Sequence, residues 1–398
     1  MSAPTGASTA ELVSTLLRED LRGQTAYGAP QLDVAVRLNT NENSYDVPPD
    51  VVAAITAAVA DVAGHLNRYP DREFAALRAA LATYLTHQTG VTLGAEHVWA
   101  ANGSNEVLQH LVQAFGGAGR TALGFTPAYS MHPIIVRTMG TAWVDGQRGA
   151  PSGTFDLTAE SAAEQVRAHQ PHLVFLCSPN NPTGTALDLD VVEAVLEAAP
   201  RSLVVVDEAY AEFARPGTLS AVSLLADHPL LVVTRTMSKA FALAGARLGY
   251  LAGAPELLEA LRLVRLPYHL SDPTQALALA ALTHHDSLLR TVEAIKTQRD
   301  RIVTELGTLG YPPVPSDANF VLFGGLADAP STWQALLERG VLVRDVGLPG
   351  YLRVTAGTPV ETDAFLAAVV DLPDSHRRAT PAAPSLVASP TSPQEPQP

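Results

Sequence analysis

The chain has 398 residues, of which 47% are hydrophobic and 17% are charged. This composition is typical of a folded protein and excludes an intrinsically disordered one, and the length allows two domains. The formal net charge of −14 excludes broad electrostatic attraction to nucleic acid or to anionic lipid. Any anionic ligand must therefore be bound by a few local cations.

The cysteine content and the terminal segment favour the cytoplasm. The single cysteine, Cys177, excludes an internal disulfide and lies in an apolar run that predicts a buried, structural thiol. Residues 1–11 lack the basic flank and apolar stretch of a signal peptide. No apolar run approaches the ~20 residues that a membrane helix needs. We therefore expect a cytoplasmic protein with no membrane partner.

The order of the elements predicts an α/β fold. Residues 1–40 are rich in turn formers and predict an N-terminal arm with an extended backbone. Over residues 60–295, short apolar runs alternate with amphipathic stretches, which predicts a large domain with a mostly parallel central sheet covered by helices. The predicted strands are 98–101, 121–125, 173–177, 203–206, 230–234 and 249–252.

A smaller α+β domain is predicted for residues 41–59 and 296–372. The expected elements in and beside its second part are a charged helix over 287–306, a helix over 332–339, and strands at 319–323, 341–343 and 351–354. Residues 373–398 are rich in proline and contain no aromatic residue, which predicts a disordered tail.

Polar segments follow the carboxyl ends of five predicted strands. In open α/β sheets this edge is where ligands bind, so we expect the segments to form one site. The segments are residues 102–105, 126–129, 178–184, 207–210 and 235–239.

Two of these segments predict a phosphate site. An apolar pattern at helical spacing begins after Gly103, so Ser104 would lie at a helix N-terminus, where free N–H groups and the helix dipole favour an anion. Taken alone, the same serine is equally a plain helix cap. Thr236 and Ser238 add two hydroxyls, and Arg247 adds a guanidinium that suits a phosphate monoester.

Other side chains predict the rest of the ligand. Asp207 ends an apolar strand, where its carboxylate either caps the next loop or pairs with a cation such as a pyridinium nitrogen. Tyr210 and Asn181 could contact a phenolate oxygen on the same ring, and Tyr129 could stack on the ring. Lys239 is one of only two lysines in the chain. Together these groups indicate an aromatic ring with a phosphate, a cationic nitrogen and an aldehyde.

The chain resembles the fold-type I pyridoxal-phosphate (PLP) aminotransferases and, among them, the histidinol-phosphate branch. The resemblance runs from about residue 21 to 370, and its motifs are at 27–30, 38–43, 67–71, 180–184, 207–210, 235–241, 243–250 and 352–355. It implies the fold-type I architecture and PLP as the cofactor. It also implies an exchange of the amino group between L-histidinol phosphate, which gives imidazole acetol phosphate, and 2-oxoglutarate, which gives glutamate, in histidine biosynthesis.

The resemblance implies a role for each cofactor contact. Lys239 would form the Schiff base and shuttle a proton, with Asp207 on the pyridinium nitrogen, and Tyr210 and Asn181 on the ring hydroxyl. Tyr129 would stack on the ring. The implied phosphate ligands are Ser104, Asn105, Thr236, Ser238 and Arg247.

The resemblance also implies substrate contacts and a homodimer with shared sites. Tyr69 would cross from the partner subunit, and Arg353 would take a substrate carboxylate. Tyr27 and Tyr69 would add hydroxyl contacts, and Arg344 suits bidentate binding of a phosphate or carboxylate but equally a surface salt bridge. Asn105 stands where aspartate is common, and Ser44 follows Asn43 where proline is usual. Neither departure removes a reactive group, so both bear on the substrate preference more than on catalysis.

Several alternatives remain open. The nearest is an aromatic-amino-acid (phenylalanine) aminotransferase on the same scaffold, followed by a phosphoamino-acid decarboxylase. A PLP-sensing regulator would need a DNA-binding module that residues 1–40 are too short and too poor in basic residues to supply. A dehydrogenase is disfavoured because no Gly-x-Gly-x-x-Gly follows a strand. The histidines at 284–285 and at 169 and 172 lack convincing ligand spacing, so we expect no metal.

Overall fold

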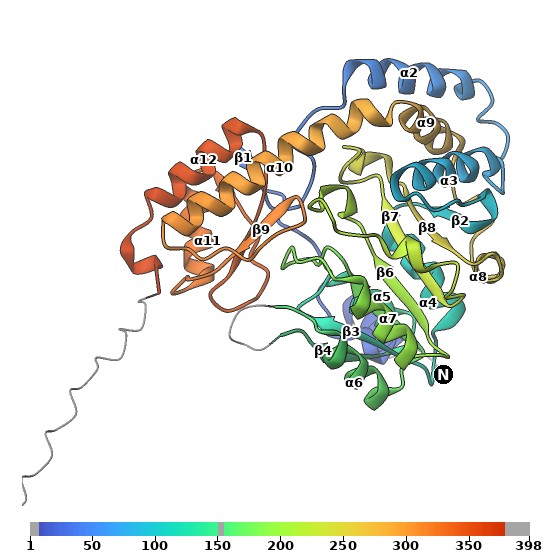
Figure 1. Ribbon diagram of the computed structural model, residues 1–398, viewed down its shortest axis with the longest axis horizontal. Coiled ribbons are helices and arrows are strands. Elements are labelled where there is room, and N and C mark those ends of the chain that lie inside the picture. Colours follow the sequence, from blue (N-terminus) through green and yellow to red (C-terminus); the bar gives the residue numbers. More distant parts are fainter. Residues whose placement is uncertain (1–7, 150–154, 379–398) are drawn as a thin grey trace, which may run out of the picture.

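The computed structural model describes residues 8–149 and 155–378 (Figure 1). A central sheet with its helices forms the larger part of the molecule, and a smaller α/β unit lies beside it. The predicted tail lies outside the described residues from position 379 onward. None of the helices in the described segments is long and apolar enough to cross a membrane.

The central sheet has seven strands in the order β2-β8-β7-β6-β5-β3-β4. Strand β8 runs opposite to the other strands of this sheet, which are all parallel to one another, so the predicted mostly parallel sheet is confirmed. The carboxyl ends of β2, β3, β5, β6 and β7 therefore meet at one edge. The bounds are β2 (Val98–Ala101), β3 (Thr121–Thr126), β4 (Ala142–Gln147), β5 (Leu173–Cys177), β6 (Leu203–Asp207), β7 (Leu231–Thr236) and β8 (Gly249–Gly253).

The central strands are apolar on both sides because helices cover both faces of the sheet. In β6, Val205 belongs to one buried cluster, whereas Val204 and Val206 belong to the other. This burial on two sides explains the continuous apolar runs of the sequence. The surrounding helices are α2 (Pro49–Ala63), α3 (Ala75–Thr89), α4 (Ser104–Phe115), α5 (Met131–Thr138), α6 (Ala159–His169), α7 (Leu189–Ala198), α8 (Pro255–Leu261) and α9 (Asp272–Thr283).

The smaller unit combines two short sheets with helices. In one sheet β1 (Val36–Arg37) pairs parallel with β10 (Val341–Leu342), and in the other β9 (Phe320–Phe323) pairs antiparallel with β11 (Leu352–Thr355). The helices are α10 (His285–Thr308), α11 (Ala329–Glu338) and α12 (Pro359–Val370). Because α2 packs on α9 whereas β1 joins β10, the segment before residue 60 contributes to both units. The domain boundaries stay a prediction.

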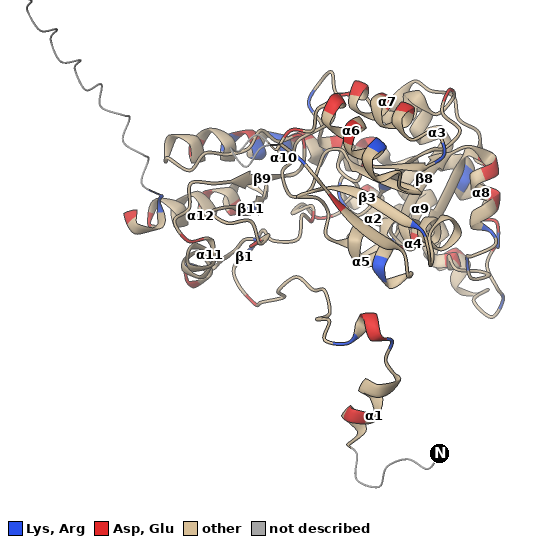
Figure 2. Cartoon of the chain, turned by 90° about the horizontal axis from the view of Figure 1, so that it is seen from below, with Lys and Arg blue, Asp and Glu red and all other residues tan. Residues whose placement is uncertain are grey.

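The N-terminal arm contains a helix that the expectation of an extended backbone missed. Helix α1 (Thr9–Leu16) lies at the end of an arm that projects from the body (Figure 2). The Ser8 hydroxyl accepts a hydrogen bond from Glu11 N (3.3 Å), and Glu11 Oε2 accepts one from Ser8 N (2.7 Å). This capping box is visible in the sequence as serine followed three residues later by glutamate.

Candidate active site

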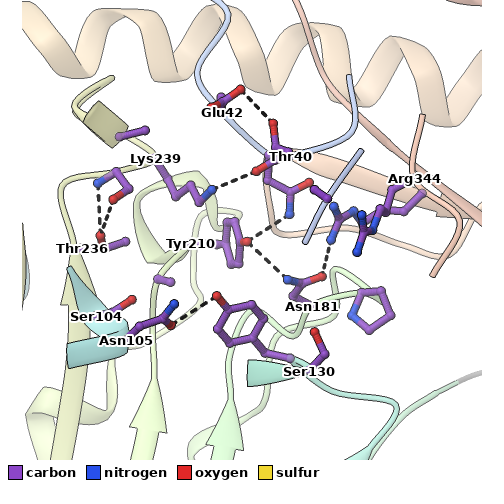
Figure 3. A pocket seen from close by; sticks show the side chains of 18 of the residues that line it. Thr40, Glu42, Ser104, Asn105, Ser130, Asn181, Tyr210, Thr236, Lys239 and Arg344 are labelled. Atoms are coloured by element: carbon purple, nitrogen blue, oxygen red, sulfur yellow. Dashed lines mark hydrogen bonds between the residues drawn. The ribbon is translucent and has the colours of Figure 1, made fainter. Parts of the chain in front are cut away.

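The carboxyl edge of the sheet opens into a cavity of about 710 Å³ (Figure 3). All but one of the predicted site residues line this cavity, and the exception is Tyr69. They are Tyr27, Ser104, Asn105, Tyr129, Asn181, Asp207, Tyr210, Thr236, Ser238, Lys239, Arg247, Arg344 and Arg353. Residues from strand ends far apart in the sequence thus surround one space.

Lys239 lies just after β7 and points into the cavity (Figure 3). Its Nζ donates a hydrogen bond to the backbone oxygen of Thr40 at 3.1 Å. Burial lowers the pKa of Lys239 to about 8, the positive charges of Arg353 and Arg247 act in the same direction, and Glu42 opposes them. A substantial fraction of the amine is therefore neutral near physiological pH, as a nucleophile or proton acceptor must be.

A cradle for a phosphate forms where α4 begins. Ser104 is the first residue of α4, and Gly103 before it has a φ of 84°, which favours glycine. A Cβ at Gly103 would overlap the Arg247 guanidinium, so the missing side chain makes room for that cation. Thr236 Oγ1 accepts a hydrogen bond from Ser238 N at 3.1 Å. A helix N-terminus, two hydroxyls and an arginine thus converge, which is a donor set that suits a phosphate monoester.

Asp207 lies at the end of β6 and is 2% exposed. His132 Nε2 lies 3.0 Å from its Oδ2, and Thr234 Oγ1 donates to its Oδ1 at 3.2 Å. These contacts hold a buried carboxylate that faces the cavity. The sequence did not predict His132, although its position on α5, three residues after Tyr129, was a usable signal. Cys177 is buried beside this site, as predicted, and burial raises the pKa of its thiol.

Tyr210 lies near the centre of the cavity, with its phenol held by two amides (Figure 3). Asn41 Nδ2 donates to Tyr210 Oη at 3.0 Å, and Asn181 Nδ2 lies 3.5 Å from the same oxygen. Burial raises the pKa of Tyr210 to about 12, against the opposing effects of Arg353 and Asn41. The phenol is therefore neutral and can donate its proton to a ligand oxygen. Asn41 lies within the motif at residues 38–43, but the sequence predicts no role for it.

The guanidinium of Arg353, on β11, already donates hydrogen bonds to neighbouring side-chain and backbone amide oxygens. Its Nη1 donates to Asn181 Oδ1 at 2.5 Å, and its Nη2 donates to the Asn39 backbone oxygen at 2.8 Å. Its buried Nε has no hydrogen-bond partner among the described residues. Burial lowers the pKa of Arg353 to about 10, and the nearby Arg344 acts in the same direction. The Arg344 guanidinium lies 5.9 Å from the centre of the Tyr27 ring.

Tyr69 lies outside this chain's own cavity. Its side chain is 79% exposed, and its ring stacks on Tyr268 with 4.4 Å between the centroids and 12° between the planes. Within a single chain it is therefore not one of the residues that line the cavity. A role for Tyr69 requires a second subunit, and this role stays a prediction.

The aminotransferase class I and II family model matches residues 33–369. A histidinol-phosphate aminotransferase from Paenarthrobacter aurescens is 61% identical over 90% of this chain and 95% of its own length. One from Frankia casuarinae is 60% identical over 89% of each chain. The crystal structure of histidinol-phosphate aminotransferase from Sinorhizobium meliloti in complex with PLP is 28% identical, with a TM-score of 0.74 over 84% of this chain and 90% of that one. The chain therefore belongs to the class I and II aminotransferases and, within them, to the histidinol-phosphate aminotransferase family.

Proposed function

We propose that this aminotransferase binds PLP through Lys239 and exchanges an amino group between L-histidinol phosphate and 2-oxoglutarate in histidine biosynthesis. The products are imidazole acetol phosphate and glutamate. The observation that carries the proposal is the half-buried Lys239 side chain, which lines the same cavity as Asp207 and the phosphate cradle at Ser104. The names of the relatives at 60–61% identity support the substrate, and the Sinorhizobium meliloti complex supports the cofactor.

The described residues fit PLP at every polar position of the molecule. The cradle of Ser104, Thr236 and Arg247 would hold the phosphate, and Asp207 would accept the ring N–H. The Tyr210 phenol, held by Asn41 at 3.0 Å, would donate to the ring oxygen. When bound, PLP supplies an electron sink that stabilises negative charge at the substrate Cα.

Lys239 would carry the proton in both halves of the reaction. Its Nζ would be released when an amino donor takes its place, would accept the proton from the substrate Cα, and would deliver it to the C4′ carbon of the cofactor. Transfer by a well-placed base contributes roughly 10²–10⁴-fold to such a step. Because the two substrates would use the same cavity in turn, we expect ping-pong kinetics.

The cavity must accept different anions in turn, because histidinol phosphate carries a phosphate and glutamate carries two carboxylates. Arg353 and Arg344 both line it and supply positive charge away from the phosphate cradle. Arg353 would bind the substrate through its remaining N–H groups, because its bonds to Asn181 Oδ1 and to the Asn39 backbone oxygen use only two of its five donors. Arg344 lies beside Tyr27, so these two side chains would bind the anion together.

We also propose a cytoplasmic homodimer in which Tyr69 completes the site of the partner subunit. The exposed Tyr69 belongs to an apolar surface with Tyr268, and Leu66, Leu263 and Leu266 are exposed in the neighbouring chain segments. Exposed apolar surface of this kind is typical of subunit interfaces. The single buried Cys177 supports a reducing compartment.

The test follows the visible absorption of the bound cofactor in purified protein. L-histidinol phosphate should convert the cofactor to its amino form, and 2-oxoglutarate should restore it, whereas Lys239→Ala should show neither change. Borohydride should fix PLP to Lys239 in the wild type. If phenylalanine drove the conversion far faster than histidinol phosphate, the aromatic-amino-acid aminotransferase would be the better assignment. Release of carbon dioxide would instead indicate a decarboxylase.

A further inference from the structure

A buried ionic cluster lies behind the strand ends that carry the site. Glu208 directly follows Asp207, the last residue of β6, and Arg235 precedes Thr236 on β7. Because side chains alternate along a strand, these two residues point away from the cavity that Asp207 and Thr236 line. They line a second cavity of about 180 Å³. The side chains of Arg235 and Glu208 are only 5% and 4% exposed.

Glu208 and Arg235 join the ends of β6 and β7 beyond their last paired residues, Asp207 and Thr234. Arg235 Nη2 lies 2.6 Å from Glu208 Oε2, and Arg235 Nε donates to the same oxygen at 2.9 Å. The Glu208 backbone N–H donates to the Thr234 oxygen at 2.9 Å. Side chain and backbone of Glu208 therefore both bind β7.

Other contacts leave this carboxylate little freedom. Ser220 Oγ donates to Glu208 Oε2 at 2.8 Å, and the Ala221 N–H donates to Oε1 at 2.7 Å. Arg235 Nη1 has a second carboxylate partner, Glu212 Oε1, at 3.1 Å. Glu212 belongs to the short helix η3 (Ala211–Phe213) and not to a strand.

Burying these charged side chains costs desolvation free energy that apolar side chains in the same space would not. Burial lowers the pKa of Arg235, but Glu208 and Glu212 outweigh this effect and hold the pKa above its usual value. Buried ion pairs often stabilise a protein no more than apolar residues of the same size would, and in some proteins they instead fix the geometry of the groups they join. The geometry fixed here is the offset between two adjacent strand ends.

We propose that Glu208 and Arg235 form a positioning pair that holds Asp207 and Thr236 at the spacing required by the ring nitrogen and the phosphate of the cofactor. The inference rests on the proposed PLP chemistry. Asp207 and Thr236 are the direct neighbours of the pair in the chain, and they would contact the two ends of the cofactor. A shift of one strand end relative to the other would weaken one of these contacts.

The experiment compares Glu208→Gln with Glu212→Gln. Both substitutions remove one carboxylate from Arg235, both sites are 4% exposed, and each leaves the arginine one counterion. Only Glu208 adjoins Asp207. Glu208→Gln should raise the dissociation constant of PLP for the apoprotein by about 10-fold, because small displacements of binding groups have large effects, and should shift the pH midpoint of the visible absorption. Glu212→Gln should leave both within about twofold, the scatter typical of independent sites.

Arg235→Lys keeps the charge but loses the planar fork, so it should weaken PLP binding less than Glu208→Gln does. The two glutamate substitutions could have equal effects, or Glu208→Gln could leave PLP binding unchanged. Either result would contradict the positioning role and show that the cluster has only a structural role. If Glu208→Gln fails to fold, Glu208→Asp should show the same loss of PLP affinity. A wild-type protein that shows no visible band with PLP would instead contradict the proposed function.

Discussion

At the scale of single residues, the proposed role of Lys239 predicts that its pKa sets how fast the apoprotein captures PLP. Because burial lowers this pKa to about 8, the neutral amine becomes more abundant as the pH rises through that value. At pH 7 about one amine in ten would be neutral, against fewer than about one in a thousand for an unperturbed lysine. The rate of PLP capture, followed by visible absorption, should rise between about pH 6.5 and 9 and then level off. A rate that keeps rising up to about pH 10.5 would contradict the low pKa.

The partner of Asp207 supports a second prediction. His132 Nε2 lies 3.0 Å from the carboxylate, and both side chains are buried. His132→Phe would leave Asp207 with only the Thr234 hydroxyl and the Ala209 N–H as hydrogen-bond donors among the described residues. We therefore expect the turnover rate to fall by about 10-fold or more, as when one member of a buried polar network is removed. His132→Gln, whose amide can still donate, should retain more activity. Equal activity in both variants would show that the hydrogen bond is not required.

The residues at this site were predictable where their chemistry is unusual for their position. A carboxylate at the end of an apolar strand, or one of two lysines after a strand, stands out in one sequence. His132 and Asn41 do not, because a histidine in a helix and an asparagine in a loop have many ordinary explanations. Their roles depend on the distances to Asp207 and Tyr210, which only the fold determines.

At the scale of elements, the central strands were predictable because helices bury both of their faces, whereas β4 was missed. Strand β4 lies at the sheet edge, and only Gly146 of its residues is buried. Its sequence, Ala-Trp-Val-Asp-Gly-Gln, therefore lacks an apolar run. Edge strands carry weaker patterns for this reason. Helix α1 was missed because turn formers dominate the sequence further along the arm, whereas the signal for the helix is the capping box of Ser8 and Glu11.

The contact between β8 and α4 gives a prediction at this scale. A Cβ at Gly249 would collide with the backbone nitrogen of Ser104 and with the carbonyl carbon of Gly103. Gly249→Ala should push the start of α4 away from β8, weaken PLP binding by about 10-fold, and cost about 1–3 kcal/mol of stability through overpacking. Gly64→Ala is the control, because a Cβ there has no atom within 4 Å. The assays are PLP titration of the apoprotein and denaturant unfolding. A variant at Gly249 that binds PLP like the control would contradict the prediction.

At the scale of the whole molecule, the residues proposed to bind the cofactor line one cavity of the chain, whereas the predicted contributor Tyr69 lies outside it. Asp207 and Lys239 line the cavity of their own chain, whereas Tyr69 is 79% exposed outside it. The motif around Tyr69 was visible in the sequence, but no pattern within one chain specifies which copy receives the side chain. In the proposed dimer, the arrangement of the two subunits determines which site receives the Tyr69 side chain.

In the proposed homodimer, where Tyr69 completes the site of the partner subunit, two variants that are inactive alone should complement each other. When Tyr69→Phe and Lys239→Ala subunits are unfolded together and refolded, half of the dimers should be hybrids, and one of the two sites in each hybrid has an intact lysine and an intact tyrosine. Recovery should therefore approach about a quarter of wild-type activity. The same mixture of Lys239→Ala with Asp207→Asn should recover nothing, because both defects lie in the cavity of their own chain. A cell that carries both alleles of the first pair would grow without added histidine, and a cell with the second pair would not.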